Sequence, residues 1–346
     1  MMTTIEVDLH SDTQTRPSEG MRHAMVSAEV GDEQRGEDPS ANRLCELATE
    51  LTSKEAAVFM PSGTMCNQVA MLVHCQPGDE IIADKTSHII NSESGGAAAL
   101  AGAQIRPVDG VRGVFTSEQA EEAINSAKRN FPKTSMIEIE QTSNAGGGSV
   151  WPLESICEVA DVGKRYGLAM HMDGARLLNA VVASNVTAAD FGAPFDSLWI
   201  DLSKGLGCPV GAVLCGSTDF IEQAWSWKQR LGGAMRQSGV IAAAGVYALE
   251  NNVERLAEDH ASARRLAEGM EGVSGIEVWP VETNLVFFDL KKTGLTAQDF
   301  HERLLKRGVR IGIKSEFEMR AVTHLDVSMD QVNRAVDAVA DVVAGA

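Results

Sequence analysis

The chain of 346 residues is 44% hydrophobic and 23% charged, which is typical of a globular protein with two or three domains, or with one large α/β domain and a smaller one. Its net charge of −18 argues against nucleic acid and anionic membranes as partners. The six cysteines form no CxxC pair and no zinc-like spacing, so we expect reduced thiols, no metal site and a cytoplasmic protein. No apolar run reaches the ~18 residues of a membrane-spanning helix, and segment 1–12 lacks the apolar core of a signal peptide.

Short apolar runs alternate with longer helical patterns over the first two thirds of the chain. The runs that predict strands lie at 56–60, 80–84, 104–108, 134–141, 168–173, 197–202 and 211–216. Helical patterns lie between them, at 65–75, 94–103, 117–130 and 153–167. This alternation predicts a mainly parallel, twisted sheet with helices on both faces. Such a sheet binds its ligands at the carboxyl ends of the strands.

The pattern changes after about residue 250. A long amphipathic helix is predicted over 251–272, followed by strands at 276–280 and 284–290, a helix near 297–307, a strand at 309–313 and a final helix over 328–346. The final helix is expected to place Val332, Val336, Val339 and Val343 on one face. We therefore predict a large domain over 1–250 and a smaller α+β domain over 251–346.

One candidate site is the segment FMPSGTMCNQ (59–68), where a predicted strand turns into a predicted helix. The backbone N–H groups at Gly63 and Thr64, together with the helix dipole, could bind an anion, most naturally a phosphate. The segment is neither a Walker loop nor a GxGxxG motif, so it carries no signature of a nucleotide or dinucleotide site. An ordinary capped turn is the alternative.

Two further candidates follow other predicted strands. In HMDGAR (171–176), Asp173 ends a strand and Arg176 comes three residues later, although Asp173 could also simply cap the next helix. In DLSKGLGCPVGAVLCG (201–216), Lys204 follows Ser203 at the end of another strand. A lysine in an apolar, partly desolvated site becomes nucleophilic, whereas a solvated surface lysine does not.

These three candidates together suit one cofactor. Pyridoxal 5'-phosphate (PLP) needs an amine for its aldehyde, a carboxylate for its pyridine nitrogen and an anchor for its phosphate. Lys204, Asp173 and the Gly63–Thr64 turn supply these groups. The sequence therefore predicts a PLP site at the carboxyl edge of the sheet.

Six segments in the same order resemble the low-specificity L-threonine aldolases, a family of PLP enzymes with the aspartate-aminotransferase fold (fold type I). They are DLHSDTQTRP, PSGTMCNQVA, MHMDGARLLNA, DLSKGLGCPVGAVLCG, GGAMRQSGVIAAAGVYALENN and VTHLDVS, and they extend over nearly the whole chain. The resemblance implies a seven-stranded, mainly parallel sheet in the large domain. It also implies packing of segment 1–14 on the small domain, and a homo-oligomer, most often a tetramer built as a dimer of dimers.

The resemblance also implies roles for individual residues near the cofactor. Lys204 matches the Schiff-base lysine, Asp173 the partner of the pyridine nitrogen, and His88 the histidine that stacks on the ring. Arg176 matches an arginine beside the ring. The expected phosphate contacts are Gly63, Thr64, Ser203 and Arg236, the last of them supplied within the chain or across a dimer interface.

The implied reaction is retro-aldol cleavage of a β-hydroxy-α-amino acid, such as L-threonine or L-allo-threonine, to glycine and an aldehyde. Ser11 and Arg320, with Arg176, match the residues that hold the substrate carboxylate. Ser143 occupies the position of a family histidine near the β-substituent, in EQTSN where many members have ENTHN. This change leaves His88 as the candidate base, acting directly or through a water.

Three other positions depart from the usual family pattern: His10, Arg35 and Gln229. Of these, Arg35, like Ser143, could change the substrate. A phenylserine-preferring aldolase, an amino-acid racemase and a hydroxymethyltransferase-like enzyme therefore stay open as alternatives. A non-catalytic protein that has kept the fold is a further alternative, although the complete set of cofactor residues argues against it.

Overall fold

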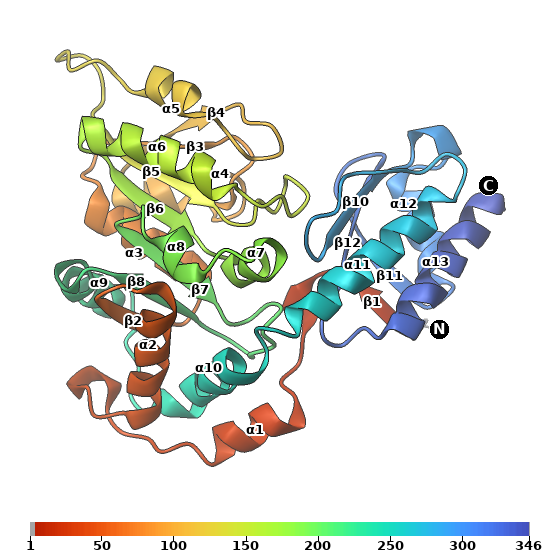
Figure 1. The fold of residues 1–346 in the computed structure, drawn as a ribbon, viewed down its shortest axis with the longest axis horizontal. Helices are drawn as coiled ribbons and strands as arrows, with labels where there is room; N and C mark the ends of the chain where they lie inside the picture. Colours follow the sequence, from red (N-terminus) through yellow and green to blue (C-terminus); the bar gives the residue numbers. More distant parts are fainter. Residues whose placement is uncertain (1–3, 346) are drawn as a thin grey trace.

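The computed structural model describes residues 4–345, so residues 1–3 and 346 of the predicted terminal segments lie outside the described part. Two β-sheets lie side by side, each covered by helices, with the chain ends near the smaller sheet (Figure 1). No helix among the described residues is long and apolar enough to cross a membrane. The predicted division into 1–250 and 251–346 stays a prediction.

The larger sheet has seven strands in the order β2-β8-β7-β6-β5-β3-β4. Only β8 runs antiparallel to its neighbours, so the predicted mainly parallel sheet is confirmed. The strand bounds agree with the apolar runs of the sequence to within one residue. They are β2 (Ala56–Met60), β3 (Glu80–Asp84), β4 (Gln104–Val108), β5 (Thr134–Glu140), β6 (Ala169–Asp173), β7 (Ser197–Asp201) and β8 (Ala212–Gly216).

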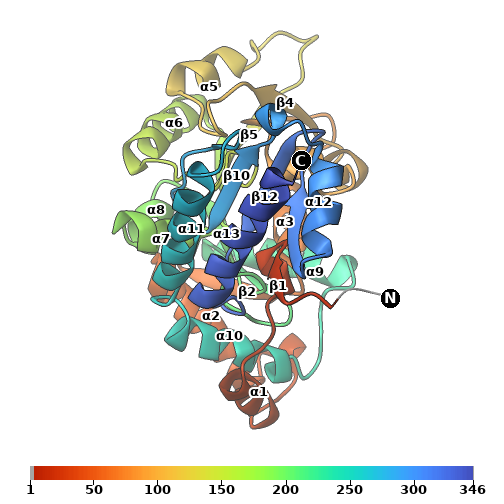
Figure 2. The same cartoon turned by 90° about the vertical axis from the view of Figure 1, so that its right-hand side faces the viewer.

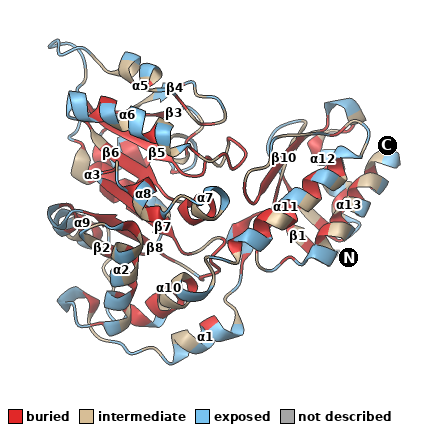
Figure 3. Cartoon of the chain, viewed as in Figure 1, coloured by how far each residue is buried: buried red, intermediate tan, exposed pale blue. Residues whose placement is uncertain are grey.

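Helices cover both faces of this sheet, which is why its central strands are almost fully buried (Figure 3). Side chains of one face pack against α2 (Pro39–Thr52), α6 (Leu153–Tyr166), α7 (Leu177–Ser184), α8 (Ala188–Gly192) and α10 (Gly239–Asn251). Those of the other face pack against α3 (Gly63–His74) and α9 (Thr218–Arg230). The remaining helices of this part are α1 (Glu19–Val26), α4 (His88–Asn91) and α5 (Ser117–Ala123).

The smaller sheet has the order β1-β11-β12-β10-β9. Its strands are β1 (Val7–Leu9), β9 (Glu277–Val278), β10 (Leu285–Asp289), β11 (Val309–Ile313) and β12 (Glu318–Val322). β1, from the start of the chain, pairs in parallel with β11. The helices α11 (Leu256–Glu271), α12 (Ala297–Leu305) and α13 (Met329–Ala344) cover one face, as Figure 2 shows. The other face carries Arg320 on β12.

Four predicted elements differ from the structure. The helix expected over 251–272 begins only at Leu256, because α10 extends to Asn251 and a turn separates the two helices. The helix expected over 117–130 ends at Ala123, because Asn125 donates its backbone N–H to Thr134 and its side-chain amide to Glu80. The strand expected over 276–280 covers only 277–278, since Pro280 has no N–H to continue the ladder. The helix expected over 94–103 is a short π-helical turn over 97–101.

The last helix and the last strand also correct the sequence analysis. On α13, Val332 and Val339 are buried as expected, but Ala335 and Val342 complete the buried stripe, and Val336 and Val343 flank it. Strand β12 was not predicted, because the segment (EMRAV) has only five residues and contains no continuous apolar run, although its alternation of polar and apolar residues is typical of a half-buried strand.

Candidate active site

The carboxyl ends of β5, β6 and β7 and the start of α3 open into a cavity of about 310 Å³. Nine of the eleven predicted site residues line it: Ser11, Gly63, Thr64, His88, Asp173, Arg176, Ser203, Lys204 and Arg320. The lining also includes residues that the sequence analysis did not select, namely Thr13, Ser62, Glu140, Asn144, Ala175, Trp199 and Asp201. Segments up to 309 residues apart (320 − 11) therefore share one site.

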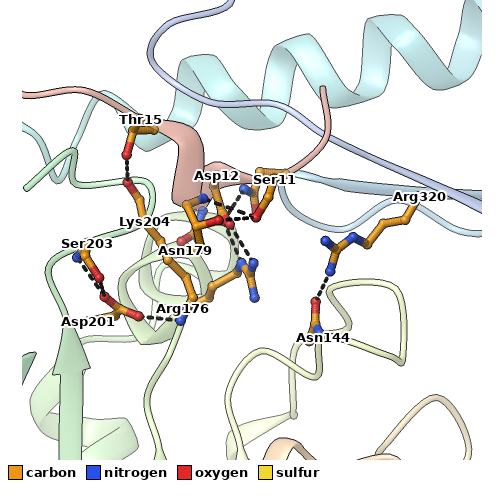
Figure 4. A network of polar contacts seen from close by, with 12 residues as sticks. Ser11, Asp12, Thr15, Asn144, Arg176, Asn179, Asp201, Ser203, Lys204 and Arg320 are labelled. Atoms are coloured by element: carbon orange, nitrogen blue, oxygen red, sulfur yellow. Dashed lines mark hydrogen bonds and ion pairs between the residues drawn. The ribbon is translucent and has the colours of Figure 1, made fainter. Parts of the chain in front are cut away.

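Lys204 lies just beyond the end of β7, where its neighbours orient it. Its Nζ pairs with the carboxylate of Asp201, the last residue of β7 (Figure 4). The same nitrogen lies 5.6 Å from the centre of the Trp199 ring. The other oxygen of Asp201 accepts hydrogen bonds from the backbone N–H and the hydroxyl of Ser203, at 2.7 and 3.0 Å. Thr15 donates its hydroxyl to the carbonyl of Lys204 at 2.9 Å. The Lys204 amine is thus held by Asp201, the last residue of the strand that precedes it.

Asp173 ends β6 and is almost completely buried. Its Oδ2 accepts a hydrogen bond from Asn67 Nδ2 at 2.8 Å, and its Oδ1 accepts from the Ala175 backbone N–H at 3.0 Å. Burial raises the pKa of the Asp173 carboxyl, and the negative Glu93 adds to this rise, whereas the Asn67 hydrogen bond opposes it. Because each oxygen has only one donor among the described residues, the carboxylate can accept another hydrogen bond from the cavity.

Gly63 is the first residue of α3, and Ser62 caps the helix by accepting from Met65 N at 3.2 Å. A Cβ on Gly63 would lie 2.1 Å from Cη2 of the Trp199 ring, far closer than any real contact. The absent side chain lets the helix start lie directly against the indole. The N–H groups of the first helical turn, including those of Gly63 and Thr64, have no partner within the helix and are suited to an anion.

Arg176 forms a buried, two-point ion pair with Asp12, with both N–O distances at 2.8 Å (Figure 4). Asn284 also donates to Asp12, at 3.1 Å. Burial alone would raise the pKa of Asp12, but the charge and hydrogen bonds of Arg176, together with the charge of Lys204 and the Asn284 hydrogen bond, outweigh burial and hold the pKa below its usual range. Asp12 therefore stays ionised and fixes the guanidinium at the wall of the cavity.

Arg320 approaches from the small sheet, on the side opposite Lys204 (Figure 4). Its Nη1 donates to Asn144 Oδ1 at 2.9 Å, and its Nε has no hydrogen-bond partner among the described residues. Burial lowers the pKa of Arg320, and the nearby positive Arg176 lowers it further. Two close arginines with spare donors are suited to a carboxylate ligand.

His88 begins the short helix α4, and its Nδ1 lies 3.0 Å from Oε1 of the buried Glu93. This hydrogen bond raises the pKa of the imidazole. Because Nδ1 is taken by Glu93, Nε2 is the atom available for proton transfer in the cavity. One potential metal-ligand atom from each of His88, Glu93 and Asp173 lies within 4.8 Å of the other two. Glu93, however, already accepts hydrogen bonds from the side-chain amides of Asn67 and Gln68.

Glu140, at the end of β5, links the two loops beside the cavity. Its carboxylate accepts from the backbone N–H of His88 at 3.1 Å and from that of Asn144 at 3.0 Å. Burial and the charge of Asp173 raise its pKa to about 7. Glu140 therefore fixes the positions of two residues that line the cavity.

Ser143 and Arg236 do not line the cavity of this chain. Ser143 is buried, and its Oγ accepts from the Gly146 N–H at 3.1 Å, so its hydroxyl faces a neighbouring loop instead of a ligand. Its neighbour Asn144 lines the cavity instead, and the expected substrate contact of Ser143 stays a prediction that this geometry does not support. Arg236 pairs with Asp32 at 2.9 Å, and its side chain is 63% exposed.

The comparisons with known proteins agree with this geometry. Residues 8–293 match the family model described as Beta-eliminating lyase. The Low specificity L-threonine aldolase of Escherichia coli (strain K12) is 42% identical over 327 residues, which cover 94% of this chain and 96% of that protein. The chain belongs to the beta-eliminating lyase family, among the low-specificity L-threonine aldolases. It is a PLP-dependent lyase.

Solved structures confirm the predicted fold. The Leishmania major threonine aldolase has a TM-score of 0.84 at 21% identity, covering 97% of this chain and 99% of that one. The aspartate aminotransferase of Rhizobium meliloti has a TM-score of 0.70 at 14% identity, covering 98% of this chain and 91% of that one. At these identities the likeness concerns the fold alone, and it places this lyase in fold type I.

The residues of the cavity fit PLP. An amine, a carboxylate that can accept another hydrogen bond and a helix start with unpaired N–H groups all face one space, which matches the aldehyde, the pyridine nitrogen and the phosphate of the cofactor. The space that a Cβ on Gly63 would need is filled by Trp199, so the helix start stays close to the ligand.

Several functional residues could not be found by sequence reasoning. Asp12, Asn67 and Glu93 act through other side chains. Asp12 lies 164 residues from Arg176 and Asn67 lies 106 residues from Asp173, whereas Glu93 is only five residues from His88. Asp201 offered a signal, because it ends an apolar strand in the same way as Asp173. Glu140 offered the same signal at the end of β5.

Proposed function

We propose that this chain cleaves the Cα–Cβ bond of L-threonine, L-allo-threonine and related β-hydroxy-α-amino acids, giving glycine and an aldehyde. One observation carries the proposal: Lys204, Asp173 and the start of α3 meet in one cavity, with Arg320 opposite them. The 42% identity to a protein named low specificity L-threonine aldolase supports the same reaction.

Six residues would hold PLP. Lys204 would bond to its aldehyde carbon, Asp173 would accept a hydrogen bond from the pyridine nitrogen, and His88 would lie against the ring. The phosphate would be bound at Gly63, Thr64 and Ser203. When bound, the cofactor supplies an electron sink for the pair that the broken Cα–Cβ bond leaves on Cα.

Arg320 orients the substrate. Its guanidinium has donors directed into the cavity, and it can exchange the neutral Asn144 for a substrate carboxylate, which is the stronger acceptor. Arg176 adds positive charge, although Asp12 holds its position, and Ser11 lies beside them. Binding the carboxylate at this wall determines which bond to Cα faces the rest of the site.

His88 takes the proton of the β-hydroxyl. Glu93 holds the imidazole through Nδ1 and stabilises its protonated form, so Nε2 accepts the proton as the aldehyde carbonyl forms. Ser143 is not available for this task, because its hydroxyl faces the Gly146 loop. A proton returned to Cα completes glycine.

We also propose that the active protein is a homo-oligomer, a tetramer built as a dimer of dimers, in the reducing cytoplasm. Arg236 is exposed and lies outside the cavity of its own chain, so it could exchange its ion pair with Asp32 for the phosphate in a neighbouring copy. Val26 on α1 and Val240 on α10 are 87% and 46% exposed, and these two helices pack together. The six cysteines are unpaired. Sedimentation measurements and a count of titratable thiols test these statements.

The decisive experiment is product analysis with PLP-loaded protein and L-threonine, L-allo-threonine or L-phenylserine. We expect equal amounts of glycine and aldehyde, lost in Lys204→Ala and kept in Lys85→Ala, a control at an exposed lysine paired with Asp109. A D-amino acid as the only product would instead indicate a racemase, and turnover of serine that requires tetrahydrofolate would indicate a hydroxymethyltransferase. Either result would overturn the proposal.

A further inference from the structure

A line of polar groups, all buried except the half-buried His74, runs from Asp173 at the carboxyl end of β6 to the amino-terminal ends of the strands. Asn67 Nδ2 lies 2.8 Å from Asp173 Oδ2, and Asn67 Oδ1 lies 3.1 Å from His171 Nε2. His171 Nδ1 is 2.8 Å from Ser197 Oγ, which is 2.8 Å from His74 Nε2. His74 lines a separate cavity of about 580 Å³ at the far edge.

We propose that Ser197 and His74 are positioning residues, which act through His171 and Asn67 to hold the Asp173 carboxylate in the orientation that the cofactor ring requires. This inference rests on the proposed PLP site. Ser197, His171, Asn67 and Asp173 are all almost completely buried, so water cannot replace a missing partner in this line.

The orientation of the Asn67 amide is fixed by its neighbours. The indole Nε1 of Trp199 lies 2.7 Å from one end of the amide, and an indole N–H can only donate. That end must therefore be the oxygen. The nitrogen then faces the carboxylates of Asp173 and Glu93, at 2.8 and 2.7 Å, and donates one hydrogen to each.

The amide orientation determines the tautomer of His171. Asn67 Oδ1 can only accept, so His171 Nε2 must carry the hydrogen. Burial lowers the pKa of His171 to about 3, so the ring is neutral and its Nδ1 is a bare acceptor. Ser197 must then donate its hydroxyl hydrogen to Nδ1.

The same reasoning extends to His74. Ser197 has used its only hydrogen, so it accepts from His74, which must carry its hydrogen on Nε2. Burial lowers the pKa of His74 to about 4, and its ring stacks on Phe220 at 4.8 Å between ring centres. All donors in the line thus point the same way, toward the carboxylates.

Such an alignment favours the ionised form of Asp173. Burial and the charge of Glu93 both oppose a charge on Asp173, and the Asn67 N–H is the one side-chain donor that it has among the described residues. Hydrogen bonds aligned in series polarise one another, so each donor behind Asn67 strengthens that bond. A PLP enzyme needs Asp173 ionised, because only the carboxylate can keep the pyridine nitrogen protonated.

The first test measures PLP affinity. Ser197→Ala removes the hydroxyl that joins the two histidines, whereas the control Ser135→Ala removes a buried hydroxyl whose hydrogen bond goes to Asp79, outside the line. We expect Ser197→Ala to raise the Kd of PLP about tenfold above the control. A difference smaller than threefold would overturn the proposal, since a merely structural hydroxyl would affect both variants alike.

A second variant, His74→Phe, tests the order of the hydrogen bonds that we infer from His74 to Asp173. His74→Phe keeps the ring that stacks on Phe220 but removes the Nε2 hydrogen, and it leaves Ser197 able to donate to His171. The Kd of PLP in His74→Phe should lie between those of wild type and Ser197→Ala. A Kd above that of Ser197→Ala would contradict the order that we infer.

The second test is independent of cofactor and turnover. Wild-type protein with ¹⁵N-labelled histidine, studied by NMR at pH 7, should show His74 and His171 neutral with hydrogen on Nε2, assigned by the shifts that Ser197→Ala and His74→Phe cause. An Nδ1–H tautomer or a charged ring at either position would overturn the proposal, even if the variants fold poorly. Absence of aldehyde from wild-type protein would instead disprove the proposed function. It would leave the PLP affinities and the histidine tautomers unaffected.

Discussion

Gly63 offers a direct test of the cofactor site, because a single methyl group would disturb it. In Gly63→Ala the new Cβ would lie 2.1 and 2.4 Å from two carbons of the Trp199 ring. Ordinary carbon contacts are 3.5–4.0 Å, so the indole or the helix start must move by more than about 1 Å. The indole is almost completely buried and donates to Asn67 at 2.7 Å, so any movement of the ring strains this hydrogen bond or pushes the ring into the cavity that it lines.

The cost can be estimated from these contacts. Overpacking of a filled core costs about 1–3 kcal/mol, and each kcal/mol lowers Tm by roughly 2–4 °C in a domain of this size. We therefore expect Gly63→Ala to melt about 2–12 °C below wild type. Because the helix start moves with the residue, PLP binding should weaken about tenfold or more.

Thermal unfolding and PLP titration check this prediction. Gly272→Ala is the matched control, since the nearest atom to its Cβ would be 3.5 Å away and its φ of −72° suits alanine. The double variant Gly63→Ala/Trp199→Phe removes the colliding part of the indole. Its fall in Tm should therefore be smaller than the sum of the falls in the two single variants. The reasoning is refuted if Gly63→Ala melts and binds PLP like the control, or if the two losses simply add.

Three further predictions follow from the buried charges. Asp12→Asn leaves Arg176 without its ionic partner and should lower the free energy of unfolding by about 3–5 kcal/mol in urea titrations; a loss below about 1 kcal/mol would contradict the buried pair. Glu140 has a folded pKa raised from 4.5 to about 7, so the stability that its neutral form contributes is complete below pH 4.5 and is lost as pH rises through 7. The stability of wild type relative to Glu140→Gln should thus fall by up to about 3 kcal/mol over that range, whereas parallel pH profiles would argue against the raised pKa. Arg320→Lys removes the planar pair of donors and should raise KM about 10- to 100-fold with a smaller change in kcat, measured by aldehyde release; a fall in kcat alone would disprove carboxylate binding.

The large sheet could be predicted almost strand by strand, because each of its strands is a short apolar run bounded by turn residues. Prediction failed at the end of α5, where polar contacts of Asn125 override the helical periodicity. It also failed at β12, the strand of Arg320, because a short alternating segment is a weaker signal than a continuous apolar run. The sequence signals of Lys204, Asp173 and Gly63 were weak one by one but specific in combination, because each residue lies at the end of a strand of the same sheet or three residues beyond it.

The supporting residues of the site were not predictable in the same way. Asp12 and Arg176 are 164 residues apart, and only the folded chain brings them together. Asn67 is one polar residue within an apolar helix, a pattern that many buried amides share. Ser143 was expected at the substrate from its place in a motif, yet its hydroxyl faces Gly146, because side-chain direction depends on local backbone geometry and not on sequence position.

The pairing of β1 with β11 has a consequence for synthesis of the protein. Asp8 and Arg310 pair across this ladder although 302 residues separate them, and the residues just after β1 form one wall of the site. The ribosome releases the amino-terminal strand long before its partner exists, so this strand must wait unpaired while the large sheet folds. A competent site can therefore arise only after nearly all of the chain has emerged. Deletion of residues 7–9 should thus impair activity as severely as damage near the cofactor.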